Sequence, residues 1–224
     1  MKYKILGTGS SGNCIIVNDN VMLDCGLTYS KIKPYLKKIK LIFISHRHTD
    51  HLLPTTIKQI AYNYPTIKFV YNIEDLQITN ILVSNGILAK NCYGINQYEW
   101  FNLGICKIKL EELYHDVLNS ACHLEIDNKK LLYVTDTSSI PFDAKNYDNY
   151  LIEANYHSRE ELEKKIQEAE EKGEFTHLKR VLYTHLCEED CIDWLKENMG
   201  DNSEYTFIHQ HVDKGDGNNE FNSM

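Results

Sequence analysis

Short apolar runs alternate with glycine, asparagine and charged residues through the first forty residues of the chain. Runs of this length, closed by turn-forming residues, are typical of short strands. The pattern predicts strands at Tyr3–Leu6, Cys14–Val17 and Val21–Asp24. A fourth strand at Leu41–Ser45 is apolar at almost every position, which indicates that both of its faces are buried.

Apolar residues at helical spacing, and further short runs, fill the rest of the chain. In the first half we expect three helices, at Lys31–Lys38, Thr55–Tyr64 and Asp75–Val83. One more strand is expected there, at Lys68–Tyr71. The second half predicts five strands, at Gln97–Phe101, Lys107–Leu110, His123–Ile126, Lys130–Thr135 and Thr206–Ile208, with a hairpin turn at Asp127–Lys130. Two further helices are expected, at Arg159–Lys172 and Cys191–Asn198.

Strands come first in each half of the chain and helices follow them. This order favours an α/β (α+β) fold of two sheets with helices on their outer faces. The pattern contains neither an internal repeat nor a linker long enough to separate domains, so we expect a single domain over residues 1–212. The polar, Gly- and Asn-rich stretch 213–224 is expected to be a disordered tail.

Composition excludes several classes of protein. Of the 224 residues, 42% are hydrophobic and 25% are charged, which is ordinary for a globular protein and excludes a disordered or fibrous chain. The longest apolar runs are far shorter than a bilayer span, and the N-terminus lacks the pattern of a signal peptide. We therefore expect a cytoplasmic protein without a membrane partner, whose seven cysteines are reduced thiols.

The formal net charge of −8 argues against a protein that coats nucleic acid without specificity. Residues 1–60, however, hold nine Lys/Arg and only three Asp. The lysines between positions 31 and 40 either guide a phosphate backbone or form the solvated face of a helix, and the sequence leaves both interpretations open.

The strongest chemical signal is the segment that follows the fourth strand, Ser45-His46-Arg47-His48-Thr49-Asp50-His51. In an extended loop, residues two apart point the same way, so His46 and His48 can bind one ion together. Asp50 and His51 follow at the next turn and face a second position. Imidazole and carboxylate are the ligands of catalytic zinc or manganese, which predicts a catalytic metal site here.

One loop cannot fill two coordination spheres, so further ligands must come from other segments. Three candidates stand where a strand or apolar run gives way to a loop, namely His115, Asp136 and His209. Taken singly, each has a structural alternative, such as a helix cap for the aspartate. Together with the loop at 46–51 they supply the missing ligands.

These motifs resemble those of the metallo-β-lactamase fold family. The family pattern is His-x-His-x-Asp-His after a hydrophobic strand, then a distant His, a Thr-Asp-Thr and a late His. The resemblance is closest to the branch of bacterial YycJ/WalJ-type proteins and their phage-borne relatives, and it extends over nearly the whole chain. The segments that carry it, besides the loop at 46–51, are Leu6–Cys14, Met22–Gly26, His115-Asp116, Thr135–Thr137, Ile152–His157 and Thr184–Leu186.

The resemblance implies a four-layer αββα sandwich, with two mixed sheets flanked by helices, and a dinuclear metal site. By this resemblance one metal ion is held by His46, His48 and His115, and the second by Asp50, His51 and His209. Asp136 bridges the two ions.

Three further assignments accompany this ligand set. His185 matches a family His-Leu-Ser element beside the metals, and we give it the role of polarising or protonating the substrate phosphate or the leaving oxygen. Asp24 is expected to orient a ligand histidine. The chain departs from the family pattern with Cys187 in place of Ser and with Gln210-His211 in place of Leu-Ser, so both His209 and His211 stay candidates for the last ligand.

The chemistry that such a site favours is hydrolysis. Two cations about 4 Å apart share a water, lower its pKa towards neutrality and neutralise charge that builds up on phosphate oxygens. Asp50 is placed to hold the resulting hydroxide, so we count it with His185 as catalytic. We expect two divalent metal ions, zinc in the first place and manganese as the alternative.

Three functions fit this expectation. The first is a phosphodiesterase or nuclease, 5′–3′ exonuclease-like by resemblance, that acts on a nucleic acid or nucleotide phosphodiester. The second is a cyclic-nucleotide phosphodiesterase of the anti-Pycsar type, and the third is a metal-binding regulatory protein without turnover. The cytoplasm would be that of a bacterium, or of the host if the protein is phage-encoded. A homodimer is left open.

Overall fold

The computed structural model describes residues 1–176 and 178–210, so the expected tail at 213–224 and the candidate ligand His211 lie outside the described residues. Its strands form two sheets of six strands each, and the first sheet uses only residues from the first half of the chain. In spatial order its strands are β1 (Tyr3–Gly7), β2 (Cys14–Val17), β3 (Val21–Leu23), β4 (Leu41–Phe43), β5 (Lys68–Asn72) and β6 (Cys92–Ile95). Pairing is antiparallel from β1 to β3 and parallel from β3 to β6.

The second sheet is built from later residues, between positions 101 and 208. Its strands, in spatial order, are β7 (Phe101–Asn102), β8 (Lys107–Leu113), β9 (Asn119–Ile126), β10 (Lys129–Val134), β11 (Asn149–Glu153) and β12 (Glu204–Ile208). The strands from β7 to β10 pair in antiparallel fashion, whereas β10, β11 and β12 are parallel. The expected mixed character of both sheets is confirmed.

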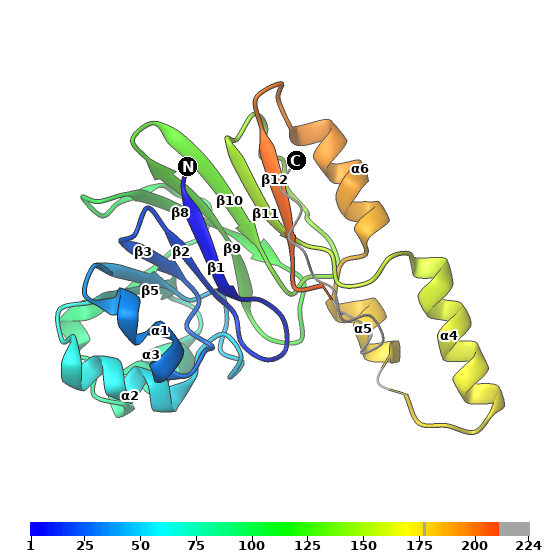
Figure 1. Ribbon diagram of the computed structural model, residues 1–224, viewed down its shortest axis with the longest axis horizontal. Helices are drawn as coiled ribbons and strands as arrows, with labels where there is room; N and C mark the ends of the chain where they lie inside the picture. The colour runs from blue at the N-terminus through cyan, green and yellow to red at the C-terminus, as the bar shows by residue number, and fades with distance from the viewer. Residues whose placement is uncertain (177, 211–224) are drawn as a thin grey trace.

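The helices lie outside the two sheets, as expected for a four-layer sandwich (Figure 1). On the side of the first sheet are α1 (Tyr29–Leu36), α2 (Pro54–Asn63), α3 (Leu76–Ser84) and a 3₁₀ turn at Ala89–Asn91. The second sheet is covered by α6 (Glu188–Asn198), while α4 (Arg159–Glu171) stands away from the body and α5 (Leu178–Thr184) lies between α4 and the sheets. We call α4 and α5 together the helical arm.

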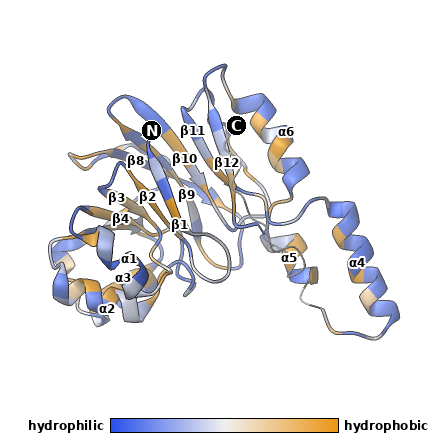
Figure 2. Cartoon of the chain, viewed as in Figure 1, coloured by the Kyte–Doolittle hydropathy of each residue, from blue (hydrophilic) through white to orange (hydrophobic). Residues whose placement is uncertain are grey.

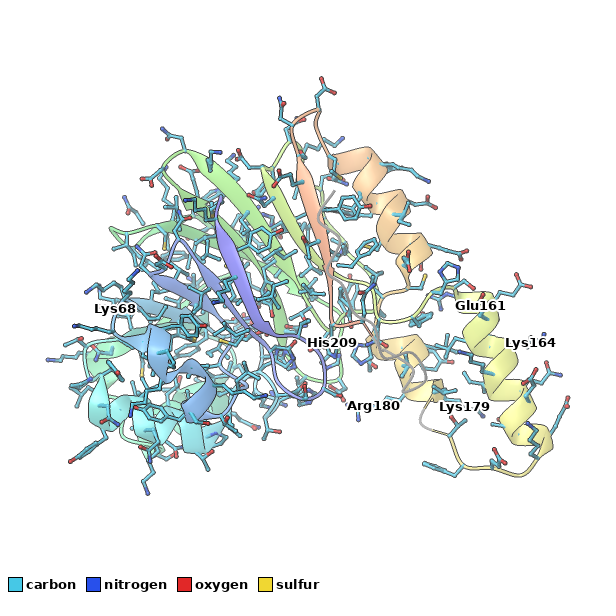
Figure 3. The ribbon with its side chains drawn as sticks, in the orientation of Figure 1. Lys68, Glu161, Lys164, Lys179, Arg180 and His209 are labelled. Atoms are coloured by element: carbon cyan, nitrogen blue, oxygen red, sulfur yellow. The ribbon has the colours of Figure 1, made fainter. Side chains whose placement is uncertain are left out.

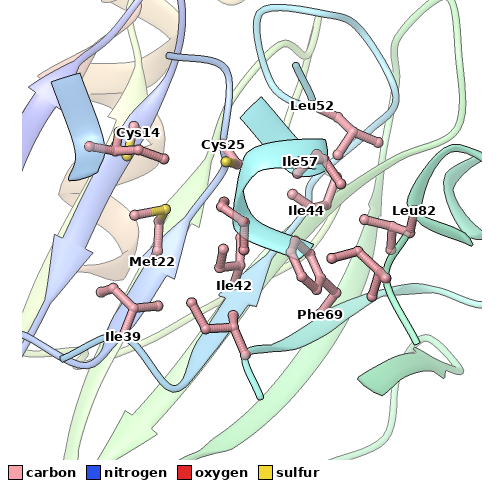
Figure 4. Packing of buried hydrophobic residues seen from close by; sticks show 14 of the residues in the cluster. Cys14, Met22, Cys25, Ile39, Ile42, Ile44, Leu52, Ile57, Phe69 and Leu82 are labelled. Atoms are coloured by element: carbon pink, nitrogen blue, oxygen red, sulfur yellow. The ribbon is translucent and has the colours of Figure 1, made fainter. Parts of the chain in front are cut away.

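Three layers of buried side chains hold the sandwich together. The layer between the first sheet and its helices includes Met22, Ile42 and Phe69 from strands, and Figure 4 shows them beside Ile57 and Leu82 from helices. A second layer fills the space between the two sheets, and a third lies between the second sheet and α6. Figure 2 shows apolar residues concentrated on the strands, whereas α4 is mostly hydrophilic. Among the described residues, no helix combines the length and apolar character that crossing a bilayer requires.

Most of the expected elements are present, with one error and three omissions. The strand expected at Gln97–Phe101 is wrong, because Tyr98 has a φ of +70° in a turn, and the strands lie on either side of it at β6 and β7. The sequence pattern did not predict β6, β11 or α5. The hairpin turn is confirmed, and its two central residues, Asp127 and Asn128, both have positive φ, as a two-residue hairpin loop requires.

His123 is a buried titratable residue of the second sheet that lies away from the candidate metal ligands. Its side chain is fully buried, and Nδ1 shares a hydrogen bond with the Tyr147 hydroxyl at 2.8 Å. Burial, and then the charges of Lys109 and Lys130, lower the pKa of His123 from 6.5 to about 3. The folded protein therefore keeps this imidazole neutral.

We expect the substitution His123→Gln to flatten the acid side of the stability curve. The unfolded chain takes up a proton near pH 6.5, whereas the folded chain does so only near pH 3, so the stability contributed by neutral His123 is complete above pH 6.5 and is lost as the pH falls towards 3. Within that window the wild type should lose up to about 1.4 kcal/mol per pH unit more than the variant. Urea unfolding at pH 5, 6, 7 and 8 measures this difference. The exposed His157→Gln is the control and should follow the wild type. If the free energy of unfolding of His123→Gln also changed with pH as that of the wild type does, the prediction would be wrong.

Candidate metal centre

The candidate site lies at one edge of the sandwich, where strands from both sheets end. The loop Ser45–His51 follows β4, and His115 lies just beyond β8. Asp136 follows β10 and His209 follows β12. Because parallel strands present their carboxyl ends at the same edge, segments distant in the sequence meet here.

Backbone contacts fix the loop at 46–51 from below. The backbone N–H of Asn13 donates to the carbonyl of Asp50 at 2.7 Å, and that of Cys25 donates to the carbonyl of His51 at 2.8 Å. Gly26 packs against the same peptide, since a Cβ placed on Gly26 would lie 1.6 Å from the carbonyl oxygen of Asp50. The loop that carries four of the candidate ligands is thus supported by the β1–β2 turn and by the residues that follow β3.

Three histidines, His46, His48 and His115, form the first group of converging nitrogens. Nδ1 of His48 lies 3.2 Å from Nε2 of His46 and 3.4 Å from Nε2 of His115. Nδ1 of His115 shares a hydrogen bond with the carbonyl of Thr184 at 3.1 Å, which leaves its Nε2 free to bind a metal ion. Burial lowers the pKa of His46 well below its ordinary value and that of His115 to about 4, so both rings are neutral, as a metal ligand must be.

Asp136 stands at the centre of the remaining ligands. Its Oδ2 lies 2.5 Å from Nε2 of His51 and 3.6 Å from Nε2 of His46, and its Oδ1 lies 2.6 Å from Nδ1 of His209. Burial alone would raise the pKa of Asp136, but His51 and His209 outweigh burial and hold it well below its ordinary value. Asp136 therefore touches both the first group of histidines and a second group around His51 and His209.

Asp50 lies at the rim of this cluster. Its carboxylate lines the cavity described below, and Oδ2 is 3.5 Å from Nε2 of His51. Burial raises the pKa of Asp50, but the contact with His51 outweighs burial, so the net pKa is lowered and the group is ionised. It is more exposed than Asp136, with 27% of its side chain accessible compared with 3%.

The donor set fits divalent cations. Its members are imidazole nitrogens and carboxylate oxygens, which suit zinc or manganese, and the converging atoms of each group lie within 4.8 Å of one another. Oδ1 of Asp136 is buried, and although Nδ1 of His209 lies 2.6 Å away, no described residue gives this oxygen a hydrogen bond of good geometry. A bound cation would satisfy it, because a buried charged oxygen without a well-aligned partner is costly.

Asp24 anchors the second group from beneath, as the sequence led us to expect for a residue that orients a ligand histidine. Oδ2 accepts from Nδ1 of His51 at 2.7 Å and from the hydroxyl of Tyr133 at 2.7 Å, and Oδ1 accepts from the backbone N–H of Ser45 at 2.8 Å. Asp24, His51 and Tyr133 are all buried. Nδ1 of His51 is therefore occupied, and Nε2 is the atom that faces Asp136.

Glu153 lies in the segment Ile152–His157, which carries part of the family resemblance, and no role for it was expected from the sequence. It is fully buried at the end of β11, and Oε1 lies 2.5 Å from Nδ1 of His185, while Oε2 accepts from the backbone N–H of Thr137 at 2.9 Å. With Asp136, His185 and His209 it forms a third group of convergent ligand atoms. An acidic residue that closes the apolar run Tyr150–Ile152 was the available signal.

The backbone at the site adopts an uncommon conformation three times. Asp24, Asp136 and His209 have φ values of +58°, +50° and +53°, in the left-handed region that few residues other than glycine occupy. Each of the three contributes a side chain to the cluster. Such conformations persist where the surrounding structure imposes them, and they gather at functional sites.

A cavity of about 520 Å³ opens onto the cluster. It is lined by the turn Thr8–Ser11, by residues of α5 and by site residues that include His48, Asp50, Asp136, His185 and His209. The structure thus brings together all of the candidates His46, His48, Asp50, His51, His115, Asp136, His185 and His209 that the sequence singled out.

Comparison with solved structures identifies the fold. The chain is similar to the metallo-β-lactamase fold protein YhfI from Bacillus subtilis, with a TM-score of 0.67, 18% identity, and coverage of 93% of this chain and 85% of that one. It is also similar to the short form of human tRNase Z, with a TM-score of 0.67, 15% identity, and coverage of 94% and 92%. Zn²⁺-bound PqqB from Methylobacterium extorquens gives a TM-score of 0.66 at 12% identity, with coverage of 94% and 89%.

At these identities the likeness concerns the fold alone. No protein-family model matches the sequence, and a search of curated proteins finds no match. The protein has the metallo-β-lactamase fold, with His/Asp clusters suited to metal ions at its open edge.

Proposed function

We propose that this protein is a dinuclear metal-dependent phosphodiesterase that cleaves phosphodiester bonds of single-stranded nucleic acid. The observation that carries the proposal is the shared position of Asp136, which contacts His46 on one side and His51 and His209 on the other, beside an open cavity. The tRNase Z fold neighbour is named for an activity on RNA, and the PqqB neighbour is zinc-bound.

In this proposal His46, His48 and His115 would hold one cation, Asp50, His51 and His209 would hold the other, and Asp136 would be a ligand common to both. Two bound cations would supply an acidified water near neutral pH and positive charge for the phosphate oxygens. The ionised Asp50, at the cavity rim, positions the attacking water and accepts a hydrogen bond from it. Zinc is the first choice and manganese the second, since both accept this mixed donor set.

His185 carries the proton for the leaving group. It lines the cavity, and Glu153 holds its Nδ1, so Nε2 is the ring atom available to the substrate. Glu153 is a positioning residue, because its second oxygen is fixed by the backbone of Thr137 and it does not itself face the cavity. Donation from Nε2 to the departing alkoxide oxygen completes the bond cleavage.

We expect His185→Ala to lower kcat for the dinucleotide TpT, whose departing alkoxide needs a proton, by about a hundredfold or more, the usual range for loss of a general acid. The zinc- and manganese-loaded protein is assayed for release of thymidine, and metal content is measured in parallel. His157→Ala serves as the matched control, because His157 is an exposed histidine between β11 and α4 and is not among the residues that line the cavity.

The same assay tests the proposal as a whole. Absence of turnover in wild-type protein that holds both metal ions would contradict the phosphodiesterase function and favour a regulatory metal-binding protein. Turnover of the wild type with an undiminished kcat in His185→Ala would remove His185 from the reaction but leave the metal centre in place.

A further inference from the structure

The cavity has two walls that the proposed chemistry does not use. One is the turn between β1 and β2, with Gly9, Ser10 and Ser11, and the other is α5 of the helical arm, with Arg180 among its lining residues. Figure 3 labels Arg180 beneath His209 at this edge of the molecule. A volume of about 520 Å³ is typical of sites that bind whole small molecules, so there is room beyond the reacting phosphate.

Arg180 is the one lining residue, among those the structure describes, with a permanent positive charge. Its Nη2 donates to Oδ2 of Asp116 at 2.6 Å, and 64% of the side chain is exposed. The guanidinium has five N–H donors in a planar fork, so the contact with Asp116 steadies one edge and leaves donors for a ligand. This geometry suits bidentate binding of a phosphate.

The opposite wall is a fixed turn that presents hydroxyl groups. The backbone N–H of Gly12 donates to the carbonyl of Gly9 at 2.9 Å, and the side chain of Asn13 accepts from the N–H of Gly9 at 2.8 Å. Gly9, with a φ of +107°, occupies a conformation that an L side chain rarely adopts. Ser10 and Ser11 are exposed at the tip of the turn and line the cavity. Their hydroxyls are hydrogen-bond donors for an anion.

We infer that Arg180, Ser10 and Ser11 form a subsite for a second phosphate of the substrate, next to the phosphate that is cleaved. The inference rests on the proposed phosphodiesterase function and narrows its substrate class. A cyclic mononucleotide has a single phosphate, which the metal centre takes, and it leaves the subsite empty. A single-stranded oligonucleotide carries a flanking phosphate that fills it.

A purely structural role for Arg180 makes a different prediction. Oδ1 of Asp116 lies 3.1 Å from Nε2 of His115, so Arg180 could act only by holding Asp116 beside the metal ligands. Loss of Arg180 would then reduce activity on every phosphodiester by the same factor. A phosphate subsite instead affects only substrates with a flanking phosphate.

The test compares thymidine dinucleotides that differ in one phosphate. TpT has only the scissile phosphate, whereas pTpT and TpTp carry a second one on the 5′ or the 3′ side. For the wild type we expect kcat/KM to be at least about tenfold higher for one of the phosphorylated forms, mainly through KM, which is the size of one charge-assisted contact. Arg180→Ala should reduce this preference about tenfold, and Arg180→Lys should restore part of it.

Lys179→Ala is the matched control, because Lys179 is the preceding residue on α5, is exposed and pairs with Glu170 outside the cavity. It should keep the wild-type preference. An equal preference in the wild type and Arg180→Ala would overturn the subsite, as would a wild type that does not distinguish TpT from either phosphorylated form.

Equilibrium binding separates failure of the subsite from failure of the proposed function. If the protein cleaves none of the dinucleotides, calorimetry with the zinc-loaded protein still compares its affinity for pTpT, TpTp and TpT. Tighter binding of a phosphorylated form that is lost in Arg180→Ala supports the subsite without turnover. Equal affinities for all three dinucleotides overturn it. Melting temperatures establish that each variant is folded.

Discussion

Replacing Asp136 with alanine is expected to lower phosphodiester turnover by about a thousandfold or more and to weaken binding of the second metal ion. A thousandfold loss corresponds to about 4 kcal/mol of transition-state stabilisation. We expect this large effect because a single buried carboxylate lies within contact distance of His46, His51 and His209. Without it, the two groups of ligands share no common member. Steady-state kinetics on bis(p-nitrophenyl) phosphate and metal analysis of the dialysed variant provide the two readouts.

The control for this variant is Asp127→Ala. Asp127 is also an aspartate with positive φ, +52°, but it lies in the β9–β10 hairpin turn, away from the site. Its replacement therefore shows what alanine at a positive φ costs in stability when the candidate ligands are unchanged. Asp136→Asn adds a second check, because asparagine tolerates positive φ and removes only the charge. Retention of more than about a tenth of the turnover by both Asp136 variants would contradict the bridging role.

The second large effect is expected from Gly26→Ala, which we predict to destabilise the protein by more than about 3 kcal/mol and to impair metal binding. The added Cβ would lie 1.6 Å from the carbonyl oxygen and 2.1 Å from the carbonyl carbon of Asp50. These are backbone atoms that cannot rotate away, so the metal loop must move. Overpacking in a fixed core costs 1–3 kcal/mol or more, and here the strain falls on the ligand loop. Urea unfolding and zinc titration measure the two consequences.

Gly94→Ala provides the comparison. Gly94 also lacks a positive φ, but its added Cβ would lie 3.0–3.2 Å from Cγ1, Cβ and Cα of the half-exposed Ile73, so relief needs a shift of only a few tenths of an ångström. We expect a cost below about 1 kcal/mol and unchanged zinc affinity. If Gly26→Ala behaved like Gly94→Ala, the loop at 46–51 would not depend on the packing described here.

Much of the site was accessible from the sequence because its signals are local. Four of the candidate ligands lie within six positions, namely His46, His48, Asp50 and His51. Their capacity to bind metal ions can be recognised without knowing the fold. His115, Asp136 and His209 became candidates because each follows an apolar run, and the structure places all of them at one edge. The sandwich of two sheets followed from the order of strands and helices.

The features that the sequence analysis missed depend on contacts between distant segments. Tyr133 appeared as an ordinary core residue of a strand, yet its hydroxyl donates to Asp24, 109 positions away. Glu153 stood in a family segment, but only the approach of α5 to the end of β11 shows that it holds His185. Neither partner can be chosen from spacing, because the tertiary structure determines which side chains meet.

The errors in secondary structure have a simpler cause. Gln97–Phe101 contains two polar and three aromatic residues in a largely alternating, strand-like order, but the positive φ of Tyr98 interrupts it with a turn. The short helix α5 buries only Thr184, so its sequence shows little of the helical periodicity that marks longer helices. In both places the segment is too short for its hydrophobic pattern to indicate the secondary structure correctly.

The two sheets come from two consecutive parts of the chain, so metal ions bound as we propose would cross-link those parts. Every strand of the first sheet precedes residue 96, and every strand of the second follows residue 100. His46, His48, Asp50 and His51 come from the first half, and His115, Asp136 and His209 from the second. Neither half holds a complete ligand set for either cation. Two ions bound as proposed would therefore link the part of the chain that forms the first sheet to the part that forms the second. Removal of the metal ions would weaken the packing between the two sheets before either sheet unfolds.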